Sequence, residues 1–389
     1  MKTEMVGIEI ENLHLAFGPT KVLTGVNLSI KPGEFFAFLG PSGSGKSTLL
    51  RSLAGFGPRP SGAIRIGGKD VVDLPPWKRN VGMVFQSYAL WPHLSVRENV
   101  AFGLRERKVP ASEIGRRVDE ALDLVGLKHL ADRMPNQLSG GQQQRIALAR
   151  TVVIEPQVLL LDEPLSNLDA SLRVQMRREL LALQRKLGLT TIFVTHDQEE
   201  ANSTCDRMAV LDKGVIQQIG RPQELYDAPV NLFVARFLGT ANILEGRVEK
   251  QGSDLRFVTG SGEALPLRGG AMGAGSVVLR PQNIAISAAA GPDTIAGRVL
   301  HSEFLGSQIR YIVRAAGAEL VVDKSHHSSE TAVPTCTVVD DAASVTVGAL
   351  LRPLFAALTV MGTAADVPVA PRSSVATAVS EIAPSDDGA

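Results

Sequence analysis

The chain has 389 residues, of which 44% are hydrophobic, and it carries 40 basic and 40 acidic side chains. That length favours two or three globular domains with ample core, and zero net charge argues against nucleic-acid binding by charge alone. An apolar stretch such as Leu354 to Met361 is far too short to span a bilayer, so any membrane role would go through a partner. The N-terminus lacks a secretory signal pattern, and two isolated cysteines, Cys205 and Cys336, favour a reduced compartment.

The first elements are expected between residues 6 and 30, where apolar and polar residues alternate as in antiparallel strands. Phe17-Gly18-Pro19 separates the two runs and forms a turn that exposes one aromatic ring. Phe17 either packs against its own domain or, because a glycine-rich loop follows shortly, stacks on a nucleotide base. The pattern leaves both interpretations open.

A glycine-rich loop at residues 40–48 follows the bulky apolar run Glu34–Leu39 and precedes good helix formers, Ser47 to Leu53. Strand, loop and helix in this order match the phosphate-binding pattern G-x-x-x-x-G-K-[ST]. Glycines let backbone N–H groups surround a phosphate, the helix adds its positive end, Lys46 supplies a mobile charge, and the Ser47 hydroxyl can hold Mg²⁺. The residues expected at the nucleotide are Gly40, Pro41, Ser42, Gly43, Ser44, Gly45, Lys46, Ser47 and Thr48.

A further buried strand, Val81–Phe85, ends at Gln86 and is followed by an aromatic-rich segment, Ser87 to Leu94. That segment either presents a docking surface or folds back on its own core, and composition does not decide between the two. Residues 96–135 then show the 3.6-residue period of amphipathic helices, which predicts an inserted α-helical unit.

The segment Leu138-Ser139-Gly140-Gly141-Gln142 precedes another helix, with Ser139 well placed as its N-cap. Two glycines at the head of a helix leave its first N–H groups bare, so this segment is a second candidate anion site. It is separate from the phosphate loop, and the presence of two such sites in one chain requires an explanation.

Acidic residues follow abruptly on the bulky apolar strand Val158–Leu161. They stand at the carboxyl end of the strand, which is the edge where α/β sheets bind ligands. Asp162 can order the shell of Mg²⁺, and Glu163 can polarise an attacking water. The strand Thr190–Thr195 ends at His196, for which we expect a contact to a terminal phosphate; the other histidines form no ligand set with it, so no metal other than Mg²⁺ is expected.

Beyond Gly239 the helical pattern gives way to short β-like runs separated by turns rich in Gly, Ala and Asp. We therefore predict an α/β domain at 1–239 with a helical insertion at about 87–155, an all-β barrel at roughly 240–362, and a disordered tail at 363–389. The β-like runs are Val277–Leu279, Ile284–Ile286, Ile309–Val313, Leu320–Val322 and Thr337–Val339.

Taken together, residues 5–238 resemble the ATP-binding subunits of ABC transporters, with all motifs in order. The loop at 40–48 is similar to the Walker A loop, Leu138–Gln142 to the LSGGQ signature, and Val158–Asp162 to the Walker B strand. Ser166–Asp169 is similar to the D-loop, where Asn167 replaces a commoner alanine, with little expected effect. The resemblance implies ATP and Mg²⁺ as ligands. By residue, it implies catalytic roles for Glu163, His196 and Gln86, adenine stacking by Phe17, nucleotide contacts by Ser139, Gly140, Gly141, Gln142, Asp162 and Asp169, and Mg²⁺ binding by Ser47, Gln86 and Asp162.

The resemblance also explains the two anion sites, because cassettes of this family pair head to tail with each ATP between one subunit's phosphate loop and the other's signature helix. The implied partners are a second copy of this chain, two integral-membrane permease subunits and, indirectly, an extracytoplasmic solute-binding protein, with no nucleic acid. The permease groove would lie beside Gln86, at Tyr88, Leu90, Trp91 and His93. The implied location is peripheral, at the cytoplasmic face of the inner membrane.

The C-terminal part resembles the OB-like TOBE regulatory extension of an importer branch, on Leu279–Ile284 and Glu303–Gly306. That branch includes polyamine, ferric-iron, sugar and phosphonate systems. The resemblance implies an ATPase that energises import, of spermidine/putrescine-type substrates ahead of iron(III), with phosphonate and sugar as further alternatives.

Three other classes fit less well. Soluble ABC proteins that act on ribosomes usually carry two cassettes in one chain, and this chain has one. A DNA-repair ATPase of the superfamily would need a long coiled coil between residues 48 and 138, where no sustained heptads lie. A nucleic-acid-binding barrel would need more aromatic and basic residues than the 11 Lys+Arg against 15 Asp+Glu at 240–389.

Overall fold

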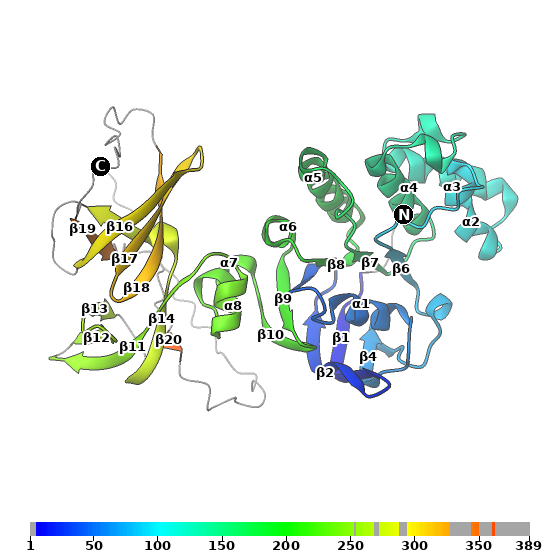
Figure 1. Ribbon diagram of the computed structural model, residues 1–389. Coiled ribbons are helices and arrows are strands. Elements are labelled where there is room, and N and C mark those ends of the chain that lie inside the picture. The colour runs from blue at the N-terminus through cyan, green and yellow to red at the C-terminus, as the bar shows by residue number, and fades with distance from the viewer. Residues whose placement is uncertain are drawn as a thin grey trace, which may run out of the picture.

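The computed structural model describes residues 5–252, 254–267, 272–287, 294–326, 344–349 and 360–361. An α/β unit and a β-rich unit lie at opposite ends, with two short helices between them (Figure 1). The strand predicted at Thr337–Val339 and the tail predicted at 363–389 lie outside the described residues. Within the described residues, no helix has both the length and the apolar character needed to cross a membrane.

An antiparallel sheet of order β2-β1-β4-β5 forms one layer of the α/β unit. β1 and β2 pair from Ile8 opposite Ile30 to Phe17 opposite Thr20, so the antiparallel pair predicted from alternation is confirmed. Its strands are β1 (Ile8–Phe17), β2 (Thr20–Ile30), β4 (Ser61–Ile66) and β5 (Lys69–Asp70).

A six-stranded sheet of order β10-β9-β3-β8-β7-β6 forms the centre of the unit. All neighbours pair in parallel except β10, which is antiparallel to β9. Every residue of β3, β7 and β8 is buried, which explains why these strands read as continuous rather than alternating apolar runs. The strands are β3 (Phe35–Leu39), β6 (Val81–Val84), β7 (Val158–Asp162), β8 (Thr190–Thr195), β9 (Arg207–Asp212) and β10 (Val215–Gly220).

Helices cover both faces of this sheet. α1 (Lys46–Ala54) packs in the core shared with the antiparallel sheet, and α5 (Ala170–Leu187) packs in the core on the other face, near the short α6 (Gln198–Thr204). The predicted helical insertion is present as α2 (Val96–Glu106), α3 (Ala111–Leu124) and α4 (Gly140–Val152), which pack around a core of their own. α4 also packs on the central sheet through Ala147, Leu148 and Val152. Short 3₁₀ turns lie at Pro76–Lys78, Lys128–Leu130, Pro135–Gln137 and Pro281–Asn283.

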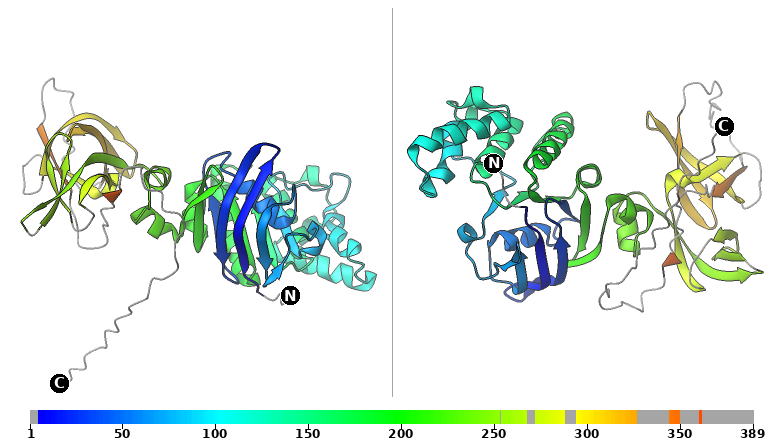
Figure 2. Two further views of the ribbon diagram at one scale, coloured as in Figure 1. Left: turned by 90° about the horizontal axis from the view of Figure 1, so that it is seen from below. Right: turned by 180° about the vertical axis from the view of Figure 1, so that it is seen from behind.

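The β-rich unit consists of two five-stranded sheets that enclose one apolar core and are seen from two further sides in Figure 2. Their orders are β13-β12-β11-β14-β20 and β15-β19-β16-β17-β18, with antiparallel pairing throughout. The strands are β11 (Asn242–Gln251), β12 (Asp254–Thr259), β13 (Ala264–Leu267), β14 (Gly273–Leu279), β15 (Ile284–Ser287), β16 (Thr294–Phe304), β17 (Gln308–Ala315), β18 (Ala318–Ser325), β19 (Ser344–Ala349) and β20 (Val360–Met361).

Two side chains of the β-rich unit bond to the connecting helices: Arg280, and Gln282, whose Nε2 donates to the Tyr226 hydroxyl at 2.8 Å. α7 (Pro222–Asp227) and α8 (Leu232–Phe237) connect them, and Arg280 of the β-rich unit donates from Nη2 to the Tyr226 carbonyl at 3.0 Å and from Nη1 to the Ala235 carbonyl at 2.9 Å. The guanidinium also lies 4.0 Å from the centre of the Tyr226 ring, and burial lowers its pKa below the usual value. Because Arg280 is buried among carbonyls and a ring, the joint depends on its hydrogen bonds.

We expect Arg280→Ala to weaken this joint by about 3–6 kcal/mol, because each of its two hydrogen bonds from a charged donor contributes about 1.5–3 kcal/mol and buried carbonyls would lose their donor. Limited proteolysis should then cut residues 239–242 faster than in the parent chain. The matched control is Arg247→Ala, an exposed arginine of the same unit. Equal cleavage rates in both variants would show that Arg280 does not hold the joint.

Candidate functional site

The phosphate-loop residues lie between β3 and α1, at the carboxyl end of the parallel strands. Gly40 approaches the neighbouring backbone so closely that a Cβ there would stand 2.3 Å from the Leu211 carbonyl oxygen. Gly45 caps α1 with φ of 97°, a left-handed conformation that other residues adopt at a cost. The two glycines that define the sequence pattern are therefore required by the backbone path.

Lys46 is folded into this loop. Its Nζ donates to the carbonyl oxygens of Gly40 and Pro41, each at 2.8 Å, and its side chain is buried. Burial lowers the pKa of the ammonium, and the nearby carboxylates of Glu163 and Asp162 act in the opposite direction. The loop thus holds a positive charge at its centre, with two acids close by.

A hydroxyl and a carboxylate meet beside Lys46. Ser47 Oγ donates to Asp162 Oδ1 at 2.8 Å, and Arg51 Nη2 lies 3.3 Å from the other carboxylate oxygen. Asp162 is 3% exposed, so its charge is held in place by these two partners. No cluster of three or more His, Cys, Asp or Glu side chains within the described residues could hold a metal ion. The Ser47–Asp162 pair nevertheless fits Mg²⁺, which takes few protein oxygens and completes its shell with phosphate and water.

The three residues predicted to be catalytic lie together at the ends of three strands. Glu163 Oε2 accepts a hydrogen bond from Gln86 Nε2 at 3.2 Å and lies 3.5 Å from His196 Nδ1. The Glu163 backbone has φ of 46°, while its N–H still bonds to the Val194 carbonyl of β8. A left-handed residue directly after β7 turns the chain off the strand path, which separates Glu163 from Asp162. Gln86 faces Glu163, and no hydrogen bond of the described residues joins its side chain to Ser47 or Asp162.

In the aromatic segment after Gln86, some side chains fold back on the core and others stay at the surface. Tyr88 is 4% exposed and its hydroxyl donates to the Pro164 carbonyl at 3.2 Å, so this ring folds back on the core. The expectation that Tyr88 lines a docking groove is wrong, because its ring is covered. Trp91 is half-buried and packs on Phe102 of α2 with ring centres 4.1 Å apart, while His93 stays exposed.

The sequence missed a contact between two functional loops. Asn167 Nδ2 donates to the Gln86 carbonyl oxygen at 2.8 Å, and Ser166 Oγ lies 3.3 Å from Gln86 Nε2. Asn167 was expected to have little effect, but the structure gives its amide a partner that an alanine could not bind. The deviation from alanine was the only signal available in the sequence.

Residues 138–142, the segment similar to the LSGGQ signature, form the N-terminal cap of α4. Ser139 Oγ accepts from the Gln142 N–H at 3.4 Å, and Gln142 Oε1 accepts from the Ser139 N–H at 2.9 Å, which confirms the predicted cap. Ser139 and Gly140 are exposed. In the part of the chain that the structure describes, no hydrogen bond links this segment to the phosphate loop. The second candidate anion site is therefore already capped and ordered, and it is separate from the first within one copy.

Two other predicted residues lie outside the central cluster. Phe17 is 51% exposed at the end of β1, with its ring open to solvent. Asp169 caps α5 by accepting from the Leu172 N–H at 2.9 Å, and its hydrogen bonds to that N–H and to Ser171 lower its pKa.

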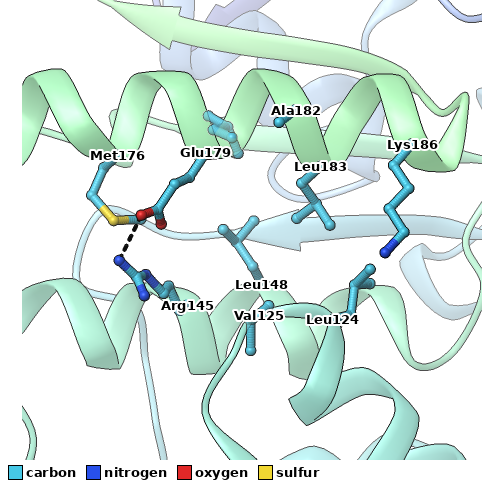
Figure 3. Close-up of a pocket in the computed structure, with 10 residues that line it drawn as sticks. Leu124, Val125, Arg145, Leu148, Met176, Glu179, Ala182, Leu183 and Lys186 are labelled. Carbon is cyan, nitrogen blue, oxygen red and sulfur yellow. Dashed lines mark hydrogen bonds and ion pairs between the residues drawn. The ribbon is translucent and has the colours of Figure 1, made fainter.

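A cavity of about 350 Å³ lies away from these residues, between α5 on one side and α4 with the end of α3 on the other (Figure 3). Its wall is mainly apolar and includes Leu148 and Leu183, and the ion pair between Arg145 and Glu179, at 2.8 Å, stands at one end. The cavity belongs to the seam between the helical insertion and α5, and not to the cluster around Lys46.

Comparison with known proteins agrees with this geometry. Residues 23–166 match the ABC transporter family and residues 277–347 match the TOBE domain. The chain is 46% identical to the Fe(3+) ions import ATP-binding protein of Rhizobium etli, over 84% of this chain and 92% of that protein. It is 48% identical to the spermidine/putrescine import ATP-binding protein of Marinobacter nauticus, over 79% and 84%. The maltose/maltodextrin import ATP-binding protein of Vibrio cholerae is 46% identical, over 81% and 86%.

A solved structure, cbiO1 of Clostridium perfringens, is also similar: it superposes with a TM-score of 0.54 at 37% identity, covering 57% of this chain and 91% of that one. The fold and the cluster define a P-loop ATPase, and the chain belongs to the ATP-binding subunits of ABC transporters. Among these subunits, this chain is the ATPase of an importer, and it carries a β-rich TOBE domain after the α/β domain.

We expect Asn167→Ala to lower ATP turnover about two- to tenfold, because a neutral hydrogen bond contributes about 0.5–1.5 kcal/mol and its loss frees Gln86. Steady-state phosphate release at saturating ATP measures this, with the exposed α6 residue changed in Asn202→Ala as control. Turnover that stays at the parental rate would restore the sequence-based view that Asn167 has little effect.

Proposed function

We propose that two copies of this chain clasp two Mg²⁺–ATP molecules head to tail and hydrolyse them to drive two permease subunits. The observation that carries this proposal is the exposed, N-capped signature helix, whose first N–H groups meet no anionic group among the described residues of its own copy. A two-fold pairing places this helix of one copy against the phosphate loop of the other.

The phosphate loop would hold the nucleotide through Lys46 and through backbone N–H groups. Lys46 would exchange the carbonyls of Gly40 and Pro41 for phosphate oxygens, which bind an ammonium more strongly because they are charged. Ser47 and Asp162, with Gln86, would hold Mg²⁺, which supplies charge neutralisation at the phosphates. Further contacts come from Pro41, Ser42, Gly43, Ser44, Gly45 and Thr48 of the loop, from Phe17 at the base, and from Gly141, Gln142 and Asp169 of the partner copy's face.

Glu163 would act as the general base. Its carboxylate takes the proton of the attacking water, and Gln86, within 3.2 Å of it, orients that water. His196, which lies 3.5 Å from the same carboxylate and is largely exposed, can reach a terminal phosphate across the site. The left-handed backbone at Glu163 keeps this carboxylate apart from Asp162, so one acid serves the water and the other the metal.

The permease subunits would dock beside the aromatic segment, at Leu90, Trp91 and His93, with the chain peripheral at the cytoplasmic face of the inner membrane. An extracytoplasmic solute-binding protein would deliver cargo to the permease. In this proposal residues 1–239 form the ATPase domain, with its helical subdomain at about 87–155, and residues 240–362 the regulatory domain.

For the cargo we propose spermidine/putrescine-type polyamines, supported by the 48% identity to the spermidine/putrescine import ATP-binding protein of Marinobacter nauticus. Iron(III), supported by a relative at 46%, is the second candidate. Purification of the intact complex, followed by titration of its binding protein with spermidine and with iron(III), decides between them. Binding of iron(III) without spermidine would overturn the polyamine assignment.

We expect Glu163→Gln to keep ATP binding while lowering turnover by about two to four orders of magnitude, which is the usual contribution of a general base. The variant should also accumulate as an ATP-bound dimer, because the clasp closes but does not reopen. Phosphate release and light scattering with and without Mg²⁺–ATP measure the two effects. Hydrolysis at the parental rate would exclude Glu163 as the base.

We expect Ser139→Arg to leave ATP binding by the isolated copy nearly unchanged while abolishing ATP-driven pairing, because a bulky cation fills the space over the helix N-terminus. Titration with a fluorescent ATP analogue and scattering in the Glu163→Gln background give the two readouts. A parallel loss of both would contradict a site shared between copies.

A further inference from the structure

Arg150 lies near the C-terminal end of α4, the helix whose other end carries Ser139. Its guanidinium reaches the loop that precedes α2, where it donates from Nη1 to the Ala89 carbonyl at 2.6 Å and from Nη2 to the Tyr88 carbonyl at 2.8 Å. The same guanidinium lies 4.8 Å from the centre of the Trp91 ring. Burial lowers the pKa of Arg150 to about 10, and no carboxylate of the described residues forms an ion pair with it. The cation is therefore held by one segment, residues 88–91.

The backbone that Arg150 holds is strained. Tyr88 has φ of 59° and Ala89 has φ of 47°, so two successive residues that carry a Cβ adopt the left-handed conformation. Each such residue costs about 1–2 kcal/mol, and the conformation persists only where the surroundings fix it. The two carbonyls that this turn directs to one side are the two that Arg150 binds.

The same segment reaches the catalytic cluster and the surface. On one side, the Gln86 carbonyl binds Asn167 and the Tyr88 hydroxyl binds the carbonyl of Pro164, the residue after Glu163. On the other side, Trp91 packs on Phe102 of α2. Residues 86–91 thus connect the carboxylate that serves water with the helical insertion.

We propose that Arg150 is a positioning residue that locks residues 86–91 to the signature helix. If the Ser139 end of α4 moves when ATP is bound between two copies, residues 86–91 move with it. In the other direction, a displacement of residues 86–91 moves the Ser139 end of α4. The movement of the Ser139 end rests on the proposed two-copy clasp. The contacts between Arg150 and residues 88–91 are present in a single copy.

A guanidinium is required because two parallel donors must meet two neighbouring carbonyls while the flat face lies against a ring. A lysine ammonium keeps the charge but cannot hold both carbonyls in one plane or stack on Trp91 in the same way. Arg150→Lys is therefore the conservative variant that separates geometry from charge.

The first test measures the lock in the nucleotide-free full chain. We expect Arg150→Lys to raise amide hydrogen exchange at residues 88–91 at least tenfold. The matched control is Arg117→Lys, because Arg117 also donates to a backbone carbonyl at the end of α4, that of Val153 at 2.8 Å, but does not bind this loop. Exchange at 88–91 that matches the control would overturn the lock.

The second test measures transmission. The chain has two tryptophans, and Trp77 is 79% exposed, so Trp77→Phe leaves Trp91 as the sole reporter. In the Trp77→Phe, Glu163→Gln chain we expect Mg²⁺–ATP to change Trp91 emission on pairing. Adding Arg150→Lys should reduce that change at least threefold while ATP affinity stays within twofold and the dimer still forms.

Each outcome bears on a different statement. If the change in Trp91 emission is as large in the Arg150→Lys dimer as in the parent dimer, transmission through Arg150 is overturned, but the proposed clasp is not. Loss of the dimer in Arg150→Lys alone would also overturn the inference, because Arg150 would then hold the helix and not link it to the loop. If the Trp77→Phe, Glu163→Gln chain, in which Arg150 is unchanged, forms no dimer with Mg²⁺–ATP, both the proposed clasp and the transmission are overturned. The hydrogen-exchange measurement still tests whether Arg150 holds residues 88–91.

Discussion

The carboxyl edge of the parallel sheet is the constraint on which the site depends. β3, β6, β7 and β8 all end there. The phosphate loop follows β3, Gln86 lies two residues after β6, Asp162 ends β7 and is followed by Glu163, and His196 follows β8. These side chains come from segments far apart in the chain, yet parallel pairing brings them within hydrogen-bond reach. The buried β3, β7 and β8 supply the rigidity that fixes these distances.

Some of the strained backbone lies close to the carboxyl edge of the sheet. Glu163, Tyr88 and Ala89 all adopt left-handed backbone without being glycine, and each is held by a hydrogen bond from elsewhere in the domain. Such conformations are retained when they orient a functional group, here the carboxylate of Glu163 and the loop next to Gln86. The stability lost there is offset by the three apolar cores of the α/β unit.

Local patterns in the sequence predicted the phosphate loop, the Ser139 cap and the end of the apolar strand at Asp162. Each of these features depends on a few consecutive residues that must meet a strict steric or hydrogen-bonding requirement. The burial of Tyr88 could not be predicted, since an aromatic residue on a loop has no periodicity that assigns it a side. The Asn167–Gln86 and Arg150–Ala89 contacts were equally hidden. They join segments 61 to 81 residues apart through side-chain bonds to backbone carbonyls, which any sequence can offer.

In the proposed two-copy clasp, the separation of the two candidate anion sites allows a nucleotide to link the copies. Lys46 and the bare N–H groups of α4 both present positive potential, so two copies facing each other without an anion gain little from these groups and bring like charges together. A triphosphate reverses the sign of that interaction, because its oxygens accept from both sides at once. In the same proposal, loss of the terminal phosphate removes the charge nearest the partner helix, so the attraction falls at the hydrolysis step assigned to Glu163.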